Sequence, residues 1–250
     1  MSIERRWIPS HDQTRGLFAE LTVQVHKHAI ETARRSGVKH VFYSSLAFGG
    51  DCKPSSAAYV MQAHLDTEAY LSSVAKEDPT FTYTAIREGI YSESFPIYTA
   101  FFNLKSPTDT ICVPYDGSGP GVAWAKQDDL GEASARLIAA YAKSPKDHPH
   151  INKAILLSGP RVWSYSETIK VLGKVTGRDV SVRNVSMDEY INQPQVAGAG
   201  GYGSGENAVK MATAFVAFKS GETAVASPLL AETLGREPEP FDVTLADMAK

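Results

Sequence analysis

The chain has 250 residues, of which 43% are hydrophobic and 21% are charged, and these ordinary globular values exclude disordered and fibrous proteins. Lysine and arginine total 25 against 28 aspartate and glutamate residues, so the net charge of -3 provides no basic field for nucleic acid. The longest apolar run, residues 137–142, is far shorter than the about 20 residues that span a bilayer, and residues 1–10 contain no signal-peptide core. We therefore expect a soluble cytoplasmic protein with no membrane or nucleic-acid partner and with its 2 cysteines reduced.

Helices and strands are predicted to alternate in the first part of the chain. Apolar residues at positions 17, 21, 25, 29 and 33 predict a helix over residues 17–36, which Gly37 ends. A β-rich run at residues 38–43 follows, then a helix over residues 59–76 and a strand over residues 81–86. This order is typical of parallel strands joined by crossover helices.

The rest of the chain continues the alternation. Strands are predicted over residues 110–114, 122–126, 154–157 and 180–185, and a helix over residues 129–143. Two capping boxes, Ser164 with Glu167 and Ser186 with Glu189, each predict the start of a further helix. Together these elements predict an α/β fold built on a doubly wound, Rossmann-like parallel sheet.

Several familiar motifs are absent or lie in the wrong context. Residues 198–203 match G-x-G-x-x-G, but a short predicted helix precedes them where a dinucleotide site needs a strand, so we interpret them as a surface loop. The histidine pairs His26/His28 and His148/His150 do not have the spacing of a metal site, and we predict no metal. The sequence has no H-E-x-x-H, G-x-S-x-G or P-loop motif.

The first candidate site lies at the carboxyl end of the strand predicted over residues 38–43, where open parallel sheets bind ligands. Ser44 and Ser45 lie there, and Tyr59 follows at a distance typical of short-chain dehydrogenases, in which a tyrosine gives a proton to the substrate carbonyl. The lysine expected one turn later is Ala63. A purely structural Tyr59 at a helix start is therefore the alternative.

A second candidate is the pair His64 and Glu68, which are one helical turn apart and share a face. The carboxylate would raise the pKa of the imidazole and orient its ring. The alternative is a solvated surface pair.

Residues 33–45 (ARRSGVKHVFYSS) resemble the helix-to-strand passage of the NmrA-like family, atypical short-chain dehydrogenase/reductase relatives common in fungi. Four further segments are similar to family landmarks in the family order: YVMQAHLDTEAYL (59–71), YTAIREGIY (83–91), DDLGEA (128–133) and LGREP (234–238). Family members begin with a strand and a G-x-x-G-x-x-G loop that binds the pyrophosphate, and this sequence contains neither. The resemblance therefore implies a single incomplete domain, with a Rossmann-type part at residues 12–88 and 128–158 and a smaller α+β substrate-side part at residues 89–127 and 159–250.

The resemblance implies an NAD(P)-dependent oxidoreductase of a small carbonyl or enoyl compound, with NADP(H) as cofactor and a role in fungal secondary metabolism. It places His64 at the position of a family lysine, so His64 and Tyr59 are the candidate catalytic residues. The candidate cofactor-binding residues are Ser44, Ser45, Leu46, His64, Gly89, Ile90 and Tyr91.

Two alternatives to a catalytic function remain open. The family includes redox-sensing regulators that bind NAD(P) and a transcription factor, so a non-catalytic regulator, also present in the nucleus, and a truncated pseudo-enzyme are alternatives. Without the phosphate-binding loop we expect weak NADPH binding. We also expect an uncovered sheet edge at residues 38–43 and an exposed apolar patch on the helix over residues 17–36, which favour self-association or a protein partner.

Overall fold

The structure, a computed structural model, describes residues 17–202 and 205–250. The long helices are α1 (Leu17–Arg35), α2 (Tyr59–Glu77), α3 (Gln127–Lys143), α4 (Tyr165–Thr176) and α7 (Glu206–Lys219). The shorter ones are α5 (Met187–Ile191), α6 (Pro194–Ala197), α8 (Leu229–Leu234), α9 (Phe241–Met248) and the 3-10 turns η1 (Ser92–Tyr98), η2 (Pro145–Asp147) and η3 (Gly200–Tyr202). The strands are β1 (His40–Leu46), β2 (Thr82–Glu88), β3 (Thr110–Val113), β4 (Lys153–Leu157) and β5 (Ser181–Asn184).

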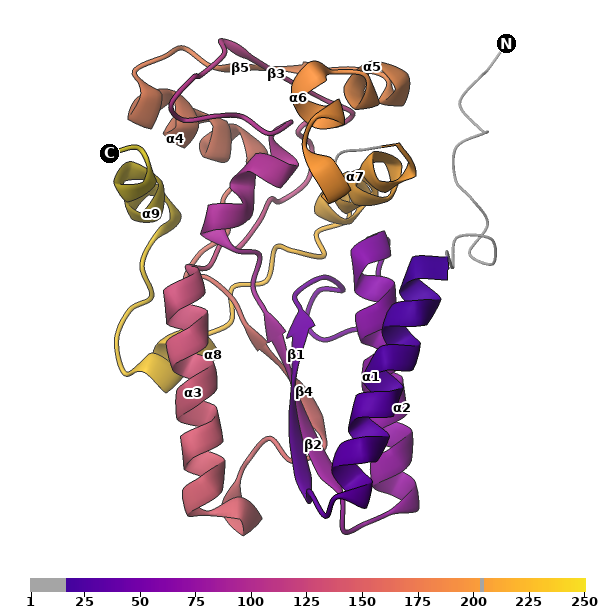
Figure 1. Cartoon of the computed structure of the whole chain (residues 1–250). Coiled ribbons are helices and arrows are strands. Elements are labelled where there is room, and N and C mark those ends of the chain that lie inside the picture. The colour runs from indigo at the N-terminus through magenta and orange to yellow at the C-terminus, as the bar shows by residue number, and fades with distance from the viewer. Residues whose placement is uncertain (1–16, 203–204) are drawn as a thin grey trace.

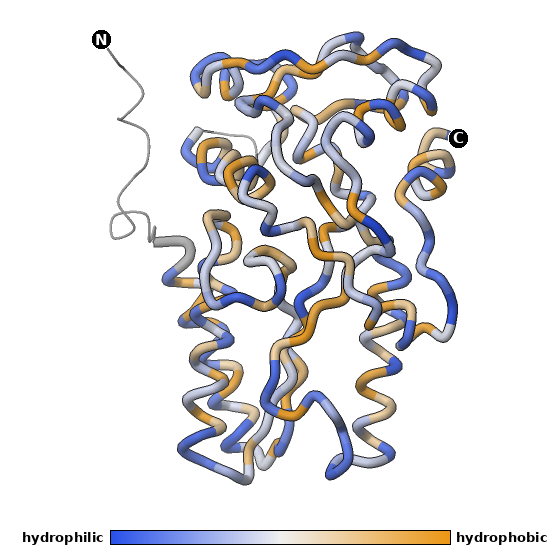
Figure 2. The backbone as a smooth tube through the Cα atoms, turned by 180° about the vertical axis from the view of Figure 1, so that it is seen from behind, coloured by the Kyte–Doolittle hydropathy of each residue, from blue (hydrophilic) through white to orange (hydrophobic). Residues whose placement is uncertain are grey.

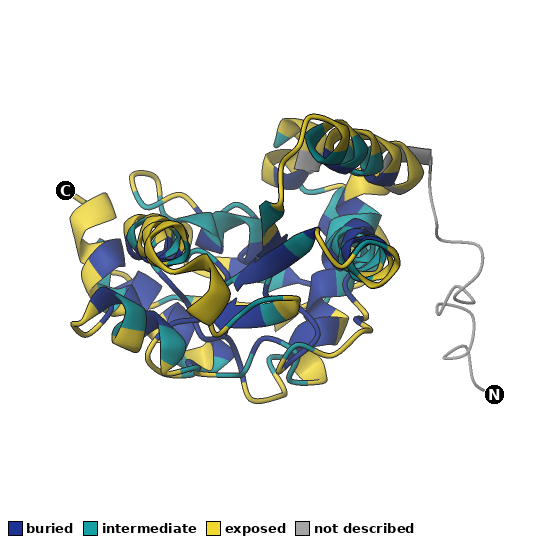
Figure 3. Ribbon diagram, turned by 90° about the horizontal axis from the view of Figure 1, so that it is seen from below, coloured by how far each residue is buried: buried dark blue, intermediate teal, exposed yellow. Residues whose placement is uncertain are grey.

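Three parallel strands in the order β1-β2-β4 form the central sheet, with α1 and α2 on one face and α3 and α8 on the other (Figure 1). Alternate residues of a strand face opposite sides. In β2, Tyr83 and Ala85 pack against Leu71 of α2, whereas Ile86 packs against Leu137 of α3. The buried strands lie between helices whose outer faces are exposed (Figure 3). This is the Rossmann-like α/β fold that the sequence predicts.

Strand β1 lies at an edge, because among the described strands it pairs with β2 alone. On the neighbouring helix α1, Leu21 is 55% exposed and Val25 is 66% exposed, whereas Val23 and Ile30 are buried. The predicted free edge is therefore confirmed for the described residues, whereas the apolar patch stays a prediction to which Leu21 and Val25 contribute.

A second part of the molecule, at the top of Figure 1, contains the parallel pair β3-β5 with α4, α5, α6, α7 and α9 around it. Its core is aromatic: the ring of Trp124 stacks 5.0 Å from that of Phe241, and Tyr98 lies 5.1 Å from Phe218. Hydrophobic residues continue through the central strands into this part (Figure 2). These elements come from the ranges 89–127 and 159–250, but α8 of the same range packs on the central sheet, and the division into two parts stays a prediction.

The strand predicted over residues 122–126 is wrong. Val122 pairs with Trp163, and Ala125 bridges Tyr91 and donates its N–H to Ile90, so the segment is divided between two partners and joins no ladder. The strand predicted over residues 38–43 begins later and continues to Leu46.

The two capping boxes differ. Ser164 and Glu167 form both reciprocal hydrogen bonds at the start of α4. Ser186 accepts from the Glu189 N–H, but the Glu189 carboxylate binds Arg183 instead of closing the box.

Candidate active site

The carboxyl ends of the three parallel strands meet at one edge, where open α/β sheets bind ligands. The Ala47 N–H donates to the Glu88 carbonyl at 2.9 Å, and the Gly89 N–H donates to the Leu157 carbonyl at 2.7 Å. A side chain at Gly89 would place its Cβ 2.9 Å from the Leu157 oxygen, so only glycine allows this approach. The segments that follow β1 and β2 therefore each form a hydrogen bond with the neighbouring strand.

A cavity of about 10 Å³, room for about one water molecule, lies at this edge. Segments from the whole length of the chain line it: Ala47, Gly89, Ile90, Ala123, Leu156, Ser158, Glu222, Thr223 and Val225. Two of the candidate cofactor-binding residues, Gly89 and Ile90, are thus brought together here. The third residue of that segment, Tyr91, donates its hydroxyl to Glu88 at 2.8 Å.

The loop between β1 and α2 is held by one carboxylate. Glu222 accepts the N–H groups of Gly49 at 3.0 Å and Ala57 at 2.8 Å, and also the Ser56 hydroxyl. Gly49 has a φ of +88°, which favours glycine. The segment after α7 therefore fixes the loop that follows β1.

The three candidate residues at the end of β1 have different surroundings. Ser44 is exposed, and Leu46 is half-buried against the aromatic core. Ser45 is buried and donates its hydroxyl to Glu68 at 2.6 Å. Of the three side chains, Ser44 is the most open to a ligand.

Glu68 forms a buried ion pair with Arg87 of β2. The guanidinium binds both carboxylate oxygens, with Nε at 3.0 Å and Nη2 at 2.6 Å, and it also donates to the Lys53 carbonyl at 2.9 Å. Arg87 is 1% exposed. Our sequence reasoning missed this pair, although an arginine within an otherwise apolar strand predicts a buried partner.

His64 does not pair with Glu68. Its Nδ1 lies 2.9 Å from the hydroxyl of Tyr43 on β1. Burial, aided by His26, lowers the pKa of His64 to about 4, against the raising effect of Glu68. The expected increase in pKa is therefore wrong, because desolvation outweighs the carboxylate, and His64 is neutral at pH 7.

Tyr43 connects His64 to α1. Its hydroxyl lies 3.4 Å from Nδ1 of His26, and that nitrogen lies 2.9 Å from the hydroxyl of Thr67 on α2. Burial raises the pKa of Tyr43 to about 12. We call His64, Tyr43, His26 and Thr67 the histidine–tyrosine string.

Tyr59 lies at the contact between α2 and α7. Its N–H donates to Thr213 at 2.8 Å, and the Lys210 ammonium lies 5.3 Å from its ring centroid. Its hydroxyl is buried and has no hydrogen-bond partner among the described residues. No hydrogen bond described in the structure joins Tyr59 to His64.

The helix N-termini at the carboxyl edge are occupied by the chain itself. At α2 the first N–H binds Thr213, and at α3 the N–H of Gln127 faces the carboxylate of Glu93 at 3.2 Å. A helix N-terminus binds phosphate through free N–H groups, and a carboxylate repels it. The N-termini of α2 and α3 among the described residues thus offer no open site for a pyrophosphate.

No group of three or more histidine, cysteine, aspartate or glutamate residues in the described part of the chain is arranged to hold a metal ion. No helix in this part of the chain is long and apolar enough to cross a bilayer.

Comparisons with solved structures agree with the fold. The NADPH complex of the NADPH-dependent quinone oxidoreductase of Escherichia coli superposes with a TM-score of 0.66 at 22% identity, covering 90% of this chain and 71% of that chain. The NADP(H) complex of Citrobacter sp. triphenylmethane reductase also gives a TM-score of 0.66 at 22% identity, covering 97% of this chain and 74% of that chain. At this identity the likeness shows the Rossmann-like fold alone.

Sequence comparisons show the family. The chain is 34% identical over 217 residues to the NmrA-like family domain-containing oxidoreductase flvB of Aspergillus flavus, covering 86% of this chain and 64% of that protein. It is 28% identical over 165 residues to quinone oxidoreductase 2 of Escherichia coli, covering 66% of this chain and 50% of that protein. The chain thus spans less than two thirds of the length of either relative. The model of the NmrA-like family matches residues 12–221, and the chain belongs to the NmrA-like family.

Proposed function

We propose that this protein is an NAD(P)-dependent oxidoreductase that reduces a small carbonyl or enoyl compound, with NADP(H) as its cofactor. The observation that carries the proposal is the convergence of Ala47 after β1, Gly89 and Ile90 after β2 and Ser158 after β4 on one cavity at the carboxyl edge of a parallel sheet. Relatives named as an NmrA-like oxidoreductase and a quinone oxidoreductase support the same reaction class. A cytoplasmic location and a role in fungal secondary metabolism are part of the proposal.

The nicotinamide end would lie against Ser44, Ser45 and Leu46 and along residues 89–91. When bound, the cofactor supplies the hydride. Ser45 is fixed by Glu68, so it shapes the wall of the site, whereas the exposed Ser44 hydroxyl is available for a ligand. The protein's own contribution is to orient the substrate oxygen and to provide a proton.

His64 is the candidate proton donor. As a neutral imidazole it polarises a carbonyl oxygen by donating a hydrogen bond, a role that a histidine of lowered pKa fills without carrying a charge. Tyr59 is the weaker candidate because no cation lies within hydrogen-bond reach of its buried hydroxyl among the described residues.

Steady-state kinetics with NADPH and a panel of quinones, enones and aldehydes tests the proposal. We expect His64→Ala to lower kcat about 100-fold and Tyr59→Phe to lower it less than about 5-fold, in the range of general acid catalysis. His28→Ala, which replaces an exposed histidine of α1, is the control and should leave kcat unchanged. Loss of activity in Tyr59→Phe with a silent His64→Ala would assign the proton donor to Tyr59.

Ala63 at the position of the lysine that would assist Tyr59 favours a second candidate, a non-catalytic regulator that senses NAD(P). Isothermal titration with NADPH and NADP+ separates the two candidates when it is combined with the kinetics. Measurable binding without turnover of any substrate in the panel would support the regulator. We expect NADPH to bind more weakly than low micromolar, because no open helix N-terminus is available for its pyrophosphate among the described residues.

A further inference from the structure

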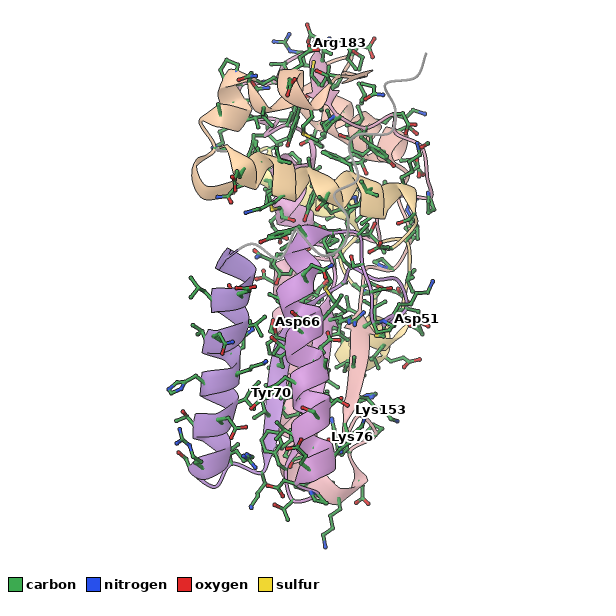
Figure 4. The ribbon with its side chains drawn as sticks, turned by 90° about the vertical axis from the view of Figure 1, so that its right-hand side faces the viewer. Asp51, Asp66, Tyr70, Lys76, Lys153 and Arg183 are labelled. Atoms are coloured by element: carbon green, nitrogen blue, oxygen red, sulfur yellow. The ribbon has the colours of Figure 1, made fainter. Side chains whose placement is uncertain are left out.

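The histidine–tyrosine string connects three elements. His64 and Thr67 lie on α2, Tyr43 on β1 and His26 on α1, and the rings of His26 and His64 are 6.5 Å apart. Helices α1 and α2 lie side by side, with Tyr70 between them further along (Figure 4). The string therefore runs from the candidate proton donor to the half-buried His26 on the outermost helix.

We assign the protons in the string from its hydrogen bonds. The Thr67 hydroxyl donates to the Ala63 carbonyl at 2.7 Å, so its oxygen accepts from His26, and Nδ1 of His26 carries a proton. The same N–H reaches the Tyr43 oxygen at 3.4 Å, which leaves the Tyr43 hydroxyl to donate to Nδ1 of His64 at 2.9 Å. His64 then carries its proton on Nε2, for which no hydrogen bond within the described residues is seen.

A neutral imidazole is a weak acid by itself, since loss of its single proton would leave an anion in a half-buried site. It becomes an effective donor when its other nitrogen receives a proton at the same time. In the string, Nδ1 of His64 already accepts a hydrogen bond from a hydroxyl group.

We propose that Tyr43 and His26 form a proton relay that replaces the proton His64 gives up during the proposed reduction. This inference rests on the proposed function. His64 gives its Nε2 proton to the substrate oxygen, and the Tyr43 hydroxyl proton passes to Nδ1 of His64. The Nδ1 proton of His26 passes to the Tyr43 oxygen, and Nε2 of His26 takes a proton from water. Each residue stays neutral, and the net change is one proton from solvent to the substrate oxygen, which balances the hydride delivered to carbon.

The kinetic test compares two tyrosine variants. Tyr43→Phe keeps the ring and removes the relay hydroxyl, and we expect kcat to fall about 10- to 100-fold with KM nearly unchanged. The solvent deuterium isotope effect on kcat should rise as the proton transfer becomes slower. Tyr70→Phe is the matched control, because its hydroxyl joins α2 to Glu31 of α1 at 2.6 Å outside the string, and it should change neither quantity. Equal effects of both variants would overturn the relay in favour of a packing role.

The second test needs no activity. Imidazole ¹⁵N–¹H correlation spectra of the wild-type chain report which nitrogen carries the proton in each histidine. We expect protonated Nε2 in His64 and protonated Nδ1 in His26, with the His64 signals shifted in Tyr43→Phe and unchanged in Tyr70→Phe. Protonated Nδ1 in His64 would overturn the relay even in an active enzyme. A wild-type chain that shows the expected tautomers but reduces nothing would overturn the proposed function and leave the hydrogen-bonded string established.

Discussion

The carboxyl ends and the amino ends of the parallel strands form two opposite edges of the central sheet. These two edges are stabilised in different ways. At the carboxyl edge, the Arg87–Glu68 pair, Ser45 and the histidine–tyrosine string form directed hydrogen bonds between strands and helices. At the amino edge, a cluster of stacked rings accompanies the hydrogen bonds: His40 stacks on Tyr141 of α3 at 4.0 Å, and His148 lies edge-on to the same ring at 5.6 Å.

The histidines make the difference clear. In the string, the described Nδ1 atoms of His26 and His64 have partners, whereas Nε2 of the buried His148 has none among the described residues. Burial lowers the pKa of both His40 and His64 to about 4. His40 combines ring stacking with hydrogen bonds, since its Nδ1 lies 2.8 Å from the Thr82 hydroxyl and its Nε2 lies 3.2 Å from that of Thr84.

The largest effect is expected at the carboxyl edge. Arg87→Met leaves Glu68 buried without its partner and should lower the free energy of unfolding by about 3–5 kcal/mol. Urea denaturation measures the change. The double variant Arg87→Met/Glu68→Leu removes both charges and should recover much of the loss, and a single variant as stable as the wild type would contradict the importance of the pair.

The close approach of β2 to β4 is the next feature to test. Gly89→Ala places a Cβ 2.9 Å from the Leu157 oxygen and 3.0 Å from the Ala125 Cβ, so we expect a loss of about 1–3 kcal/mol. Gly131→Ala is the matched control, since nothing lies within 4 Å of its added Cβ in the second turn of α3. This variant should gain about 0.5–1 kcal/mol from helix propensity. Destabilisation of both variants alike would show that the contact at Gly89 does not matter.

Acid should affect the amino edge most, by a smaller amount. Because the pKa of His40 is about 4 in the folded state against 6.5 in the unfolded state, the unfolded chain binds more protons between these values. Stability should therefore fall as pH decreases from about 6.5 to about 4. His148 and His150, whose pKa values burial also lowers, add to the effect at this edge, whereas His64 adds to it at the other.

Urea midpoints at pH 7 and pH 5 measure this dependence. His40→Phe keeps a ring for stacking. It should reduce the loss of unfolding free energy between pH 7 and pH 5 by up to about 1 kcal/mol, after allowance for solvent screening. His28→Gln, a change at an exposed position, is the control and should keep the wild-type dependence. A decrease that is the same in His40→Phe and in the wild type would place the acid sensitivity elsewhere.

Much of the fold was predictable because its signals are local. The helix ended by Gly37, the capping box at Ser164 and the alternation of strands with helices all depend on residues close in sequence. The strand predicted over residues 122–126 was wrong because β propensity does not reveal that Val122 and Ala125 have different partners, which only the tertiary fold decides.

The candidate site was predictable in position but not in its contacts. Parallel topology places the residues after β1 and β2 at one edge, and Gly89 and Ile90 do line the cavity there. Helical spacing suggested that Glu68 serves His64, yet Arg87, 19 residues further on, binds that carboxylate. Such contacts between elements cannot be read from the spacing within one helix.

The Glu222 carboxylate that holds the loop after β1 has a consequence for the order in which the protein assembles. It joins Gly49 to a residue 173 positions later, so ordering this loop requires closure of more than two thirds of the chain. The unit β1-α2-β2 leaves the ribosome long before Glu222 is made. The wall of the candidate site beside β1 is therefore among the last parts of the molecule to form during synthesis.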